Sequence, residues 1–503
     1  MAFRPRCVAS TLRESFGVLK RHSDGSTMLG DPIPLLHLYP LELVTILGAL
    51  AMAVARWQPE RYRRRVAIGA VAVGVPAAVG VLLFGLRWQL VPVLAAMALV
   101  LPSLVLLIAP SRGRAPGRAP RWVAAPATVV LVGMVAGGAA AGWAMPVPMF
   151  PQPIGQYPVG TTTLQWTDAD RAETATSDPD DRRTVVAQLW YPAASDKGPR
   201  APYLGRTPEE AATVAAGLAN YTGLPGFVLD GLAHASTPAI LDAEPADGAQ
   251  FPVVLFSPGL GGVRGQNTLW AMELASHGYV VVALDHPYDS AAVVLADGTV
   301  VHTRVAATGD DARDRQLGVG WTTVRAEDLS FALTSLGKTR FARVLDLDRV
   351  AVTGHSLGGG AALMAARLDH RFDAVVDLDG FPYDPSPGQF PQPVLVVNHP
   401  LGEDEKADFL DAADRVLDLA GAGYRVEMPG TAHLTFTDAP IWLPPLPSVV
   451  GTLGRYPGPE LTAEITMVFL DHELRGQGSE PRLRLSLSGF GELAHVTAGS
   501  AGR

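Results

Sequence analysis

Cysteine is almost missing from this chain, because Cys7 is the single one among 503 residues. One thiol cannot form an internal disulfide or build a cysteine metal site. Charge is also scarce: Asp, Glu, Lys and Arg make up 18 % of the residues, where about a quarter is usual. These two scarcities exclude a disulfide scaffold and make the placement of the few charges informative.

The charges divide the chain into two unlike parts. Residues 1–145 carry 15 Lys and Arg against 5 Asp and Glu, a net charge of +10, and the total of −9 leaves −19 for residues 146–503. The acidic back part lacks the basic footprint that nucleic-acid binding requires, so we expect no nucleic-acid partner. A chain of this length has room for more than one domain and a sizeable core.

Long apolar runs fill the basic front part. Four stretches of 18 to 22 residues are long enough to cross a hydrocarbon core of roughly 30 Å, and they span residues 38–55, 66–86, 90–109 and 122–143. Glu42, near one end, is the single charge inside them. We expect four transmembrane helices within residues 38–145, after a leader at 1–37 in which Met28 is a second possible start. The alternatives are buried core helices or one signal segment, and the near absence of intramembrane charge favours an anchor over a transporter or channel.

Basic residues predict the orientation of these helices. Two loops, between the first and second and between the third and fourth stretches, carry nine arginines: Arg56, Arg61, Arg63, Arg64, Arg65, Arg112, Arg114, Arg118 and Arg121. The opposite side has Arg87, with Lys20 and Arg21 further upstream. Short loops that are rich in Lys and Arg lie preferentially on the cytoplasmic side of a membrane. We therefore expect a multi-pass protein of the cell membrane whose back part is extracytoplasmic.

The back part begins with a proline-rich segment, residues 146–159, which we expect to be an extended linker. From residue 160 short β-branched runs alternate with longer helical ones, a pattern typical of a mostly parallel α/β sheet. The expected strands are 184–191, 252–257, 279–285, 349–354, 374–379, 393–399 and 425–429, and the expected helices 326–336, 358–368, 406–419 and 461–474. We assign residues 160–476 to this domain and 477–503 to a C-terminal tail.

The motif Gly354-His355-Ser356-Leu357-Gly358 follows an expected strand and precedes a helix of small residues. G-x-S-x-G in this context is typical of the nucleophile elbow of the α/β-hydrolase fold, in which a sharp turn exposes the serine hydroxyl above the sheet. A glycine-rich turn with an N-capping serine is the alternative interpretation. We predict Ser356 to be the nucleophile.

A nucleophilic serine needs a histidine base. Five histidines lie downstream of Ser356: His370, His399, His433, His472 and His495. His370 precedes a strand at the wrong end of the sheet, His472 is within a helix, and His495 is in the expected tail. His433 follows a late strand in a Gly-Thr-Ala-His turn, at the carboxyl end of the sheet where ligands bind, and is the predicted base.

The base in turn needs an acid, expected after the strand that follows the nucleophile helix. Asp379 has that position, and Asp377 and Asp384 are its rivals. The oxyanion hole needs two backbone N–H groups. One is expected from Leu357 and the other from Gly259, Leu260 or Gly261, because Pro258 has no N–H.

Several segments together resemble the plasma-type platelet-activating-factor acetylhydrolases and the related cutinase-like branch of the α/β-hydrolases. They are Leu189–Pro192, Phe256–Gly262, Leu274–Val281, Asp285-His286, the Gly354–Gly359 elbow, Leu378-Asp379, and Gly430–His433 followed by Phe436 and Asp438. The resemblance covers about residues 184–438. It implies a triad of Ser356, Asp379 and His433, oxyanion donors at Leu260 and Leu357, and no metal or organic cofactor. Ser257-Pro258 departs from the Ser-His usual in that family, and so does the membrane block.

The predicted function is therefore that of a membrane-anchored serine hydrolase of carboxylic esters. The resemblance implies small-molecule or lipid esters as substrates, including short or oxidised acyl groups of phospholipids. An amidase, thioesterase or acyltransferase would use the same triad, and a non-catalytic membrane-tethered binding protein is a further alternative. Segments 208–235 and 291–321 are candidate lids or ordinary insertions. The oligomeric state stays open.

Overall fold

The computed structural model describes residues 38–109, 120–384, 388 and 390–497. The chain divides into two compact units, Met1–Trp143 and Ala144–Arg503. The expected leader at 1–37, with the second possible start at Met28, lies outside the described residues.

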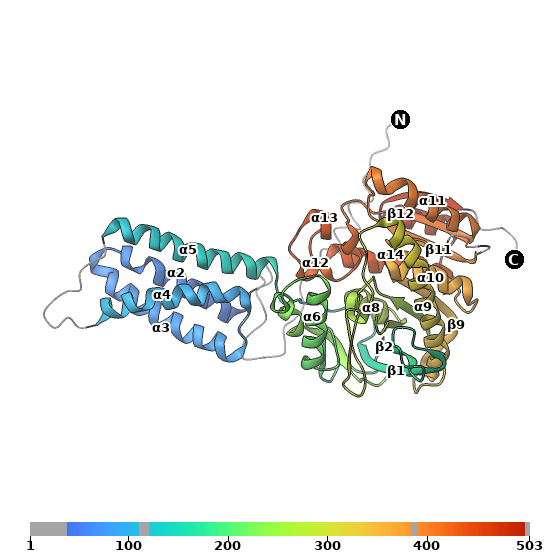
Figure 1. Cartoon of the computed structure of the whole chain (residues 1–503), viewed down its shortest axis with the longest axis horizontal. Helices are drawn as coiled ribbons and strands as arrows, with labels where there is room; N and C mark the ends of the chain where they lie inside the picture. Colours follow the sequence, from blue (N-terminus) through green and yellow to red (C-terminus); the bar gives the residue numbers. More distant parts are fainter. Residues whose placement is uncertain (1–37, 110–119, 385–387, 389, 498–503) are drawn as a thin grey trace. The chain divides into compact units, whose positions relative to one another are not determined.

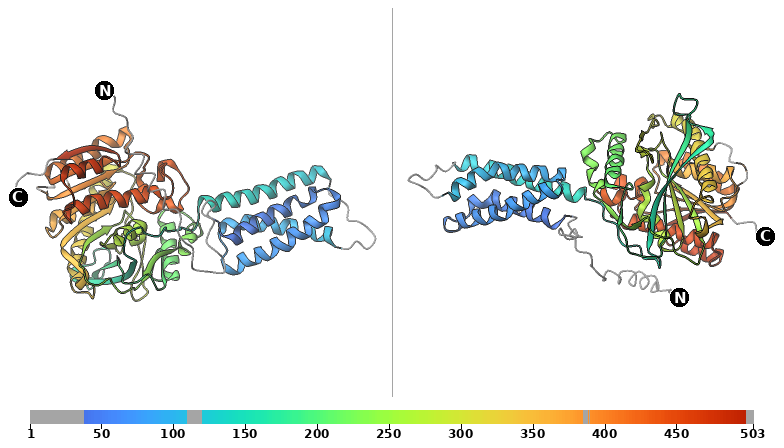
Figure 2. Two further views of the ribbon diagram at one scale, coloured as in Figure 1. Left: turned by 180° about the vertical axis from the view of Figure 1, so that it is seen from behind. Right: turned by 90° about the horizontal axis from the view of Figure 1, so that it is seen from below.

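The described part of the first unit contains four helices that occupy the expected apolar stretches: α2 (Pro40–Val54), α3 (Glu60–Phe84), α4 (Val91–Ile108) and α5 (Arg121–Ala144). They lie side by side in both views (Figures 1 and 2). Four helices of the described residues are long and apolar enough to cross a membrane, by length and composition. Many of their large side chains face outward, including Leu83 and Leu99, as suits helices that meet lipid.

Polar side chains are placed at the two ends of this helical unit. At one end, Arg64 of α3 donates to the carbonyl oxygen of Ile108, the last residue of α4 (3.0 Å). The start of α3, which carries four of the expected loop arginines, thus lies beside the end of α4. Three other arginines, Arg112, Arg114 and Arg118, fall outside the described residues. Elsewhere, Arg87 donates to both carboxylate oxygens of Glu42 (3.1 Å each), which explains how a charge is accommodated in an apolar helix.

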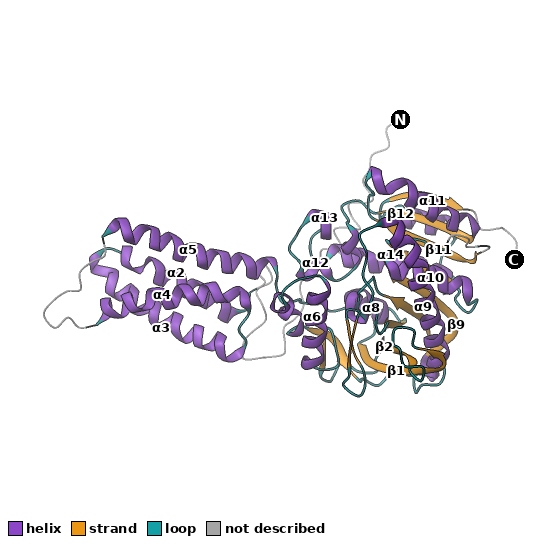
Figure 3. Cartoon of the chain, in the orientation of Figure 1, coloured by secondary structure: helices purple, strands orange, loops and turns teal. Residues whose placement is uncertain are grey.

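The second unit is built around a sheet of eleven strands in the described residues, in the order β13-β12-β11-β10-β9-β5-β6-β2-β1-β4-β3 (Figure 3). Strands β12, β11, β10, β9, β5 and β6 are mutually parallel. The strands are β1 (Val159–Ala172), β2 (Arg182–Pro192), β3 (Arg200–Pro202), β4 (Ser236–Leu241), β5 (Phe251–Ser257), β6 (Val280–Asp285), β9 (Leu345–His355), β10 (Ala374–Leu378), β11 (Phe390–Asn398), β12 (Ala420–Glu427) and β13 (Glu492–Thr497). The predicted mostly parallel α/β fold is confirmed.

Helices cover both faces of this sheet (Figure 2). One face packs on α9 (Asp311–Leu336), α10 (Leu357–Leu368) and α11 (Glu403–Leu419), and the other on α8 (Thr268–Ser276), α14 (Pro457–Glu473) and α15 (Glu480–Leu487). The parallel strands are continuous apolar runs because both of their faces are buried. Every residue of β5, β6 and β10 is buried. The residues that directly follow these strands are therefore held in fixed positions at the carboxyl end of the sheet.

In the described residues, four further helices and a hairpin lie outside this layered core. They are α6 (Pro208–Tyr221), α7 (Asp230–Ala233), the pair α12 (Ala439–Trp442) and α13 (Pro447–Val450), and the two strands β7 (Ala292–Val294) and β8 (Val300–His302). The two candidate lid segments thus form α6–α7 and the β7–β8 hairpin with the start of α9. Tyr221, the last residue of α6, lies against Gly261, where an added Cβ would come within 2.4 Å of its ring.

Two segments differ from the sequence-based expectation. The proline-rich segment packs on the domain. The backbone N–H of Ile154 donates to the carboxylate of Glu273 (3.3 Å), and the backbone N–H of Tyr157 donates to the carbonyl oxygen of Ser276 (3.0 Å). Residues 477–497, expected as a tail, form α15 and β13, and β13 pairs antiparallel with β12. The structure differs from the expected tail because pairing with β12 orders a run of six residues that is too short to indicate a strand by itself.

Candidate active site

Ser356 stands at the turn between β9 and α10. Its backbone angles, φ of +56° and ψ of −124°, lie in a region that residues other than glycine rarely adopt. An added Cβ on Gly354 would lie 2.1 Å from the carbonyl oxygen of Gly358, and one on Gly358 would lie 2.0 Å from that of Ser257. The turn therefore has the backbone of a nucleophile elbow, and both glycines of the motif are sterically required.

The structure brings the three predicted side chains together. His433 Nε2 lies 3.0 Å from Ser356 Oγ, and His433 Nδ1 lies 2.6 Å from Asp379 Oδ2. Ser356 follows β9, Asp379 follows β10, and His433 follows β12 in the short helix η7 (His433–Phe436). Because these strands are parallel, their carboxyl ends meet at one end of the sheet. Asp379 is buried, whereas the imidazole of His433 is 44 % exposed and within reach of a ligand.

Asp379 also binds a second histidine, which is absent from the predicted triad. His399 Nδ1 lies 2.8 Å from each oxygen of Asp379, and the backbone N–H of His399 donates to Oδ1 (3.0 Å). Burial alone would raise the pKa of Asp379, but the hydrogen bonds from His399 and His433 outweigh it and hold that pKa well below its usual value. The carboxylate is therefore charged and fixed by donors from two strands.

The rival acids are engaged elsewhere. Asp377 is fully buried and accepts from the N–H of Gly380 (2.8 Å), and burial raises its pKa well above the usual value. Asp384 forms an ion pair with Arg367 (2.5 Å). Asp379 is the one of the three candidates that hydrogen-bonds His433.

His355, next to Ser356, links His433 to the loop after β5. Its Nε2 donates to the carbonyl oxygen of His433 (2.9 Å), and its Nδ1 lies 3.0 Å from Gln266 Nε2. Gln266 Oε1 accepts from the N–H of Gly259 (3.3 Å), so the amide group faces His355 and Nδ1 must be an unprotonated acceptor. Burial, together with the nearby His433, lowers the pKa of His355 to about 3.

The loop after β5 lies beside Ser356, because an added Cβ on Gly259 would be 3.5 Å from Ser356 Cβ. The N–H of Gly259 donates to Gln266, which leaves Leu260 and Gly261 as the candidate donors from this loop. Within the part of the chain that the structure describes, the N–H groups of Leu260 and Leu357 donate to no protein acceptor. They are available for an oxygen that carries developing charge.

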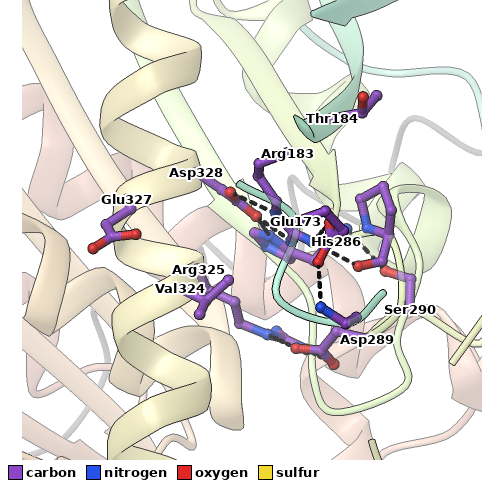
Figure 4. Close-up of polar contacts among 12 residues, drawn as sticks. Glu173, Arg183, Thr184, His286, Asp289, Ser290, Val324, Arg325, Glu327 and Asp328 are labelled. Carbon is purple, nitrogen blue, oxygen red and sulfur yellow. Dashed lines mark hydrogen bonds and ion pairs between the residues drawn. The ribbon is translucent and has the colours of Figure 1, made fainter. Parts of the chain in front are cut away.

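A second serine–histidine–aspartate arrangement lies under this loop and was not expected from sequence. Ser257 Oγ lies 2.9 Å from His286 Nε2, and His286 Nδ1 lies 2.8 Å from Asp328 Oδ2. Asp328 also accepts from Arg183 (2.6 Å), as Figure 4 shows. All three members of this arrangement are completely buried, so it holds the loop from beneath and has no access to a substrate.

Asp379, His399 and His433 could also hold a metal ion, because one possible ligand atom from each lies within 4.8 Å of the others. A cation at this point would have to replace the imidazole protons that bind Asp379. His433 would then lose the hydrogen bond that orients it toward Ser356.

Comparison with known proteins gives two family matches. The family "Platelet-activating factor acetylhydrolase, isoform II" matches residues 144–308, and the "Dienelactone hydrolase family" matches residues 239–423. The platelet-activating factor acetylhydrolase of Bos taurus is 28 % identical over 196 residues, 32 % of this chain and 43 % of that protein. A probable 1-alkyl-2-acetylglycerophosphocholine esterase of Arthroderma benhamiae is 28 % identical over 248 residues, 46 % of this chain and 59 % of that protein.

A cutinase and a solved esterase structure are also similar to this chain. Cutinase est1 of Thermobifida alba is 26 % identical over 157 residues, which cover 31 % of this chain and 44 % of the cutinase. The structure of a ferulic acid esterase from Streptomyces cinnamoneus superposes with a TM-score of 0.55 and 28 % identity, over 65 % of this chain and 94 % of the esterase. All these relatives bear the names of carboxylic ester hydrolases.

The fold and the matches define the second unit as an α/β-hydrolase. Within that class it is similar to the platelet-activating-factor acetylhydrolases and cutinases, as its sequence motifs predict. The chain spans about half the length of the curated relatives it matches.

Proposed function

We propose that this chain is a membrane-anchored serine hydrolase that cleaves carboxylic esters. The observation that carries the proposal is the continuous hydrogen-bonded series Ser356–His433–Asp379 at the carboxyl end of the sheet. The relatives, all named as ester hydrolases, support esters over the alternatives of amides, thioesters or acyl transfer.

In the proposed cycle, Ser356 Oγ attacks the carbonyl carbon of the ester while its proton passes to His433 Nε2. Asp379 holds the other imidazole N–H and stabilises the charged ring. The N–H groups of Leu260 and Leu357 bind the oxyanion, each contributing about 3 kcal/mol to the transition state. His433 then protonates the leaving alcohol, and an acyl-enzyme remains. A water molecule, deprotonated by His433, releases the acid.

Short acyl groups on phospholipids are the proposed substrates. Two of the relatives are named for removal of an acetyl group from a glycerophosphocholine or from platelet-activating factor. A hydrolase domain tethered to a membrane would also stay close to such lipids. Ser257-Pro258 and the cutinase and ferulic acid esterase relatives widen this class to other short or aromatic esters.

The activity test uses the full-length protein in detergent and the variant Ser356→Ala. Release of p-nitrophenol is measured from acetyl, butyryl and longer p-nitrophenyl esters, with a short-chain phospholipid as a parallel substrate. The proposal expects turnover of the short esters that is abolished in the variant. A folded protein that turns over none of the esters would contradict it, and the same assay with an anilide and a thioester would test the alternatives.

We also propose that four helices span the membrane with the hydrolase domain outside the cytoplasm. The arginines near the start of α3 and the start of α5 support this orientation. The test uses the scarcity of cysteine: in a Cys7→Ser background, Asp196→Cys in the domain and Arg61→Cys in α3 are both exposed positions. In intact cells a membrane-impermeant maleimide should label the first and not the second. The opposite pattern would contradict the orientation.

A further inference from the structure

Arg325 of α9 is completely buried directly under the loop that follows β5. Its guanidinium donates two hydrogen bonds to the carboxylate of Asp289, from Nε (2.6 Å) and from Nη2 (2.7 Å). Figure 4 shows this pair. A buried arginine with one carboxylate partner has donors to spare, and the position of the remaining donors is informative.

The remaining donors bind the backbone of the loop. Nη2 donates to the carbonyl oxygen of Gly259 (3.0 Å), and Nη1 donates to the carbonyl oxygen of Pro258 and to Ser257 Oγ (3.3 Å). Two consecutive carbonyl groups are thus attached to one planar cation. The geometry of a guanidinium allows this, because its N–H groups form a rigid fork.

The direction of these carbonyl groups determines the direction of the neighbouring N–H groups. In a trans peptide the C=O and the following N–H lie in one plane and point in opposite directions. The carbonyl of Gly259 points down to Arg325, so the N–H of Leu260 points away from it. The N–H of Gly259, in the preceding peptide, is likewise directed to Gln266 Oε1 (3.3 Å).

Ser356 lies beside Gly259 of the same loop. An added Cβ on Gly259 would be 3.5 Å from Ser356 Cβ, and the N–H of Leu260 donates to no acceptor among the described residues. We infer that Arg325 is a positioning residue for the oxyanion hole: by binding the Pro258 and Gly259 carbonyls, it aims the N–H of Leu260 at the substrate oxygen. This inference rests on the proposed esterase function.

Arg325 acts on the N–H of Leu260 and not on that of Gly261. The N–H of Gly261 shares a peptide with the carbonyl of Leu260, and the hydrogen bonds of the Arg325 guanidinium go to Asp289, Ser257, Pro258 and Gly259. Asp289 in turn keeps the guanidinium from rotating, and the buried Ser257–His286–Asp328 arrangement holds the strand end from which the loop departs.

The experiment compares full-length wild-type protein, Arg325→Lys, Arg325→Gln and the control Arg343→Gln. Arg343 is a surface arginine whose side chain is 54 % exposed and pairs with Asp247 and Glu244. For each protein, kcat and KM are measured on a short p-nitrophenyl ester. The inhibition constant of an alkylboronic acid, which forms a tetrahedral anion on the serine, is measured beside them.

Loss of one oxyanion donor costs about 10²- to 10³-fold in kcat, and a misdirected donor should cost less. We expect Arg325→Gln to lower kcat by about 10- to 100-fold and Arg325→Lys by a smaller factor, because an ammonium keeps the pair with Asp289 but cannot span two carbonyls. KM should change little, and boronate binding should weaken in proportion to kcat. Arg343→Gln should match the wild type.

A purely structural role would instead lower the melting temperature while kcat and boronate affinity per folded molecule stay unchanged, and that result would overturn the inference. So would loss of folding in both Arg325 variants, since the guanidinium would then be a requirement of the fold. A wild-type protein without esterase activity would refute the proposed function itself, which is a separate outcome.

Discussion

His355 should make the folded protein sensitive to acid. Burial and the neighbouring His433 lower its pKa to about 3 in the folded state, against about 6.5 for an exposed histidine. The folded state therefore binds fewer protons than the unfolded state, and stability is lost as the pH falls below 6.5. At pH 4.5 the loss amounts to about 2.7 kcal/mol, because each pH unit in this window contributes about 1.4 kcal/mol.

The structure explains why protonation is resisted. A proton on Nδ1 would face the amide group of Gln266, whose oxygen is held by the N–H of Gly259. His355→Gln keeps a neutral donor for the carbonyl of His433 but has no proton to gain. We expect the variant to be less stable than the wild type at pH 7.5, by about 1 to 2 kcal/mol for the poorer hydrogen bonds.

The assay is urea unfolding of both full-length proteins in detergent, followed by tryptophan fluorescence from pH 7.5 to pH 4.5. The difference between the two free energies of unfolding should shrink as the pH falls and then change sign, since the wild type alone carries the contribution of about 2.7 kcal/mol. Two curves that fall in parallel would refute the reasoning, because the proton would then bind at another group.

Three further substitutions test the site. Asp379→Asn should lower kcat about 10⁴-fold with little change in the unfolding midpoint, since the base would lose its tautomer partner; retention of activity would exclude Asp379 as the acid. His399→Phe should lower kcat by about tenfold, or about 1.4 kcal/mol, because one donor to the Asp379 carboxylate is lost; an unchanged kcat would leave His399 a bystander. Gly354→Ala should prevent folding, because its Cβ would lie 2.1 Å from a backbone oxygen. The control Gly320→Ala, at a position with open space around it, should keep the melting temperature of the wild type, and thermal melts of both variants measure the difference.

The elbow could be predicted from the sequence because its signal is local. A β-branched strand, a five-residue turn and a helix of small residues follow one another. A Cβ added to Gly354 or Gly358 would clash with a backbone oxygen, which explains why no larger residue stands at either position. The order and spacing of Asp379 and His433 along the chain then follow from the parallel sheet. Each lies after a strand, so the carboxyl end of the sheet brings them to Ser356.

The position of His399 along the chain also carries a signal. It stands directly after β11, the strand next to β10, which leads to Asp379. The argument that selected His433 from its place after a late strand applies equally to His399. A triad has one base, however, so the pattern of a triad alone does not predict a second histidine that donates to the acid.

Arg325 and Asp289 could not have been found from the sequence. Arg325 stands in a helix rich in charged residues, where an arginine usually faces solvent, and Asp289 lies in a turn after β6. Their contact depends on how α9 packs over the end of β5, which only the folded chain defines. Strand β1 escaped prediction for a related reason: its second half is polar and exposed, so it lacks an apolar pattern.

The pairing of β13 with β12 has a practical consequence for the limits of the folded domain. A chain shortened at residue 476, the boundary expected from sequence, would leave β12 with a row of unpaired N–H and C=O groups from Gly423 to Glu427. An uncapped edge of this kind adds strands from other molecules, and Tyr424 and Val426, now buried, would reinforce such stacking. The last twenty or so described residues thus cover the edge of β12, the strand that leads to His433, and protect it from pairing with other molecules.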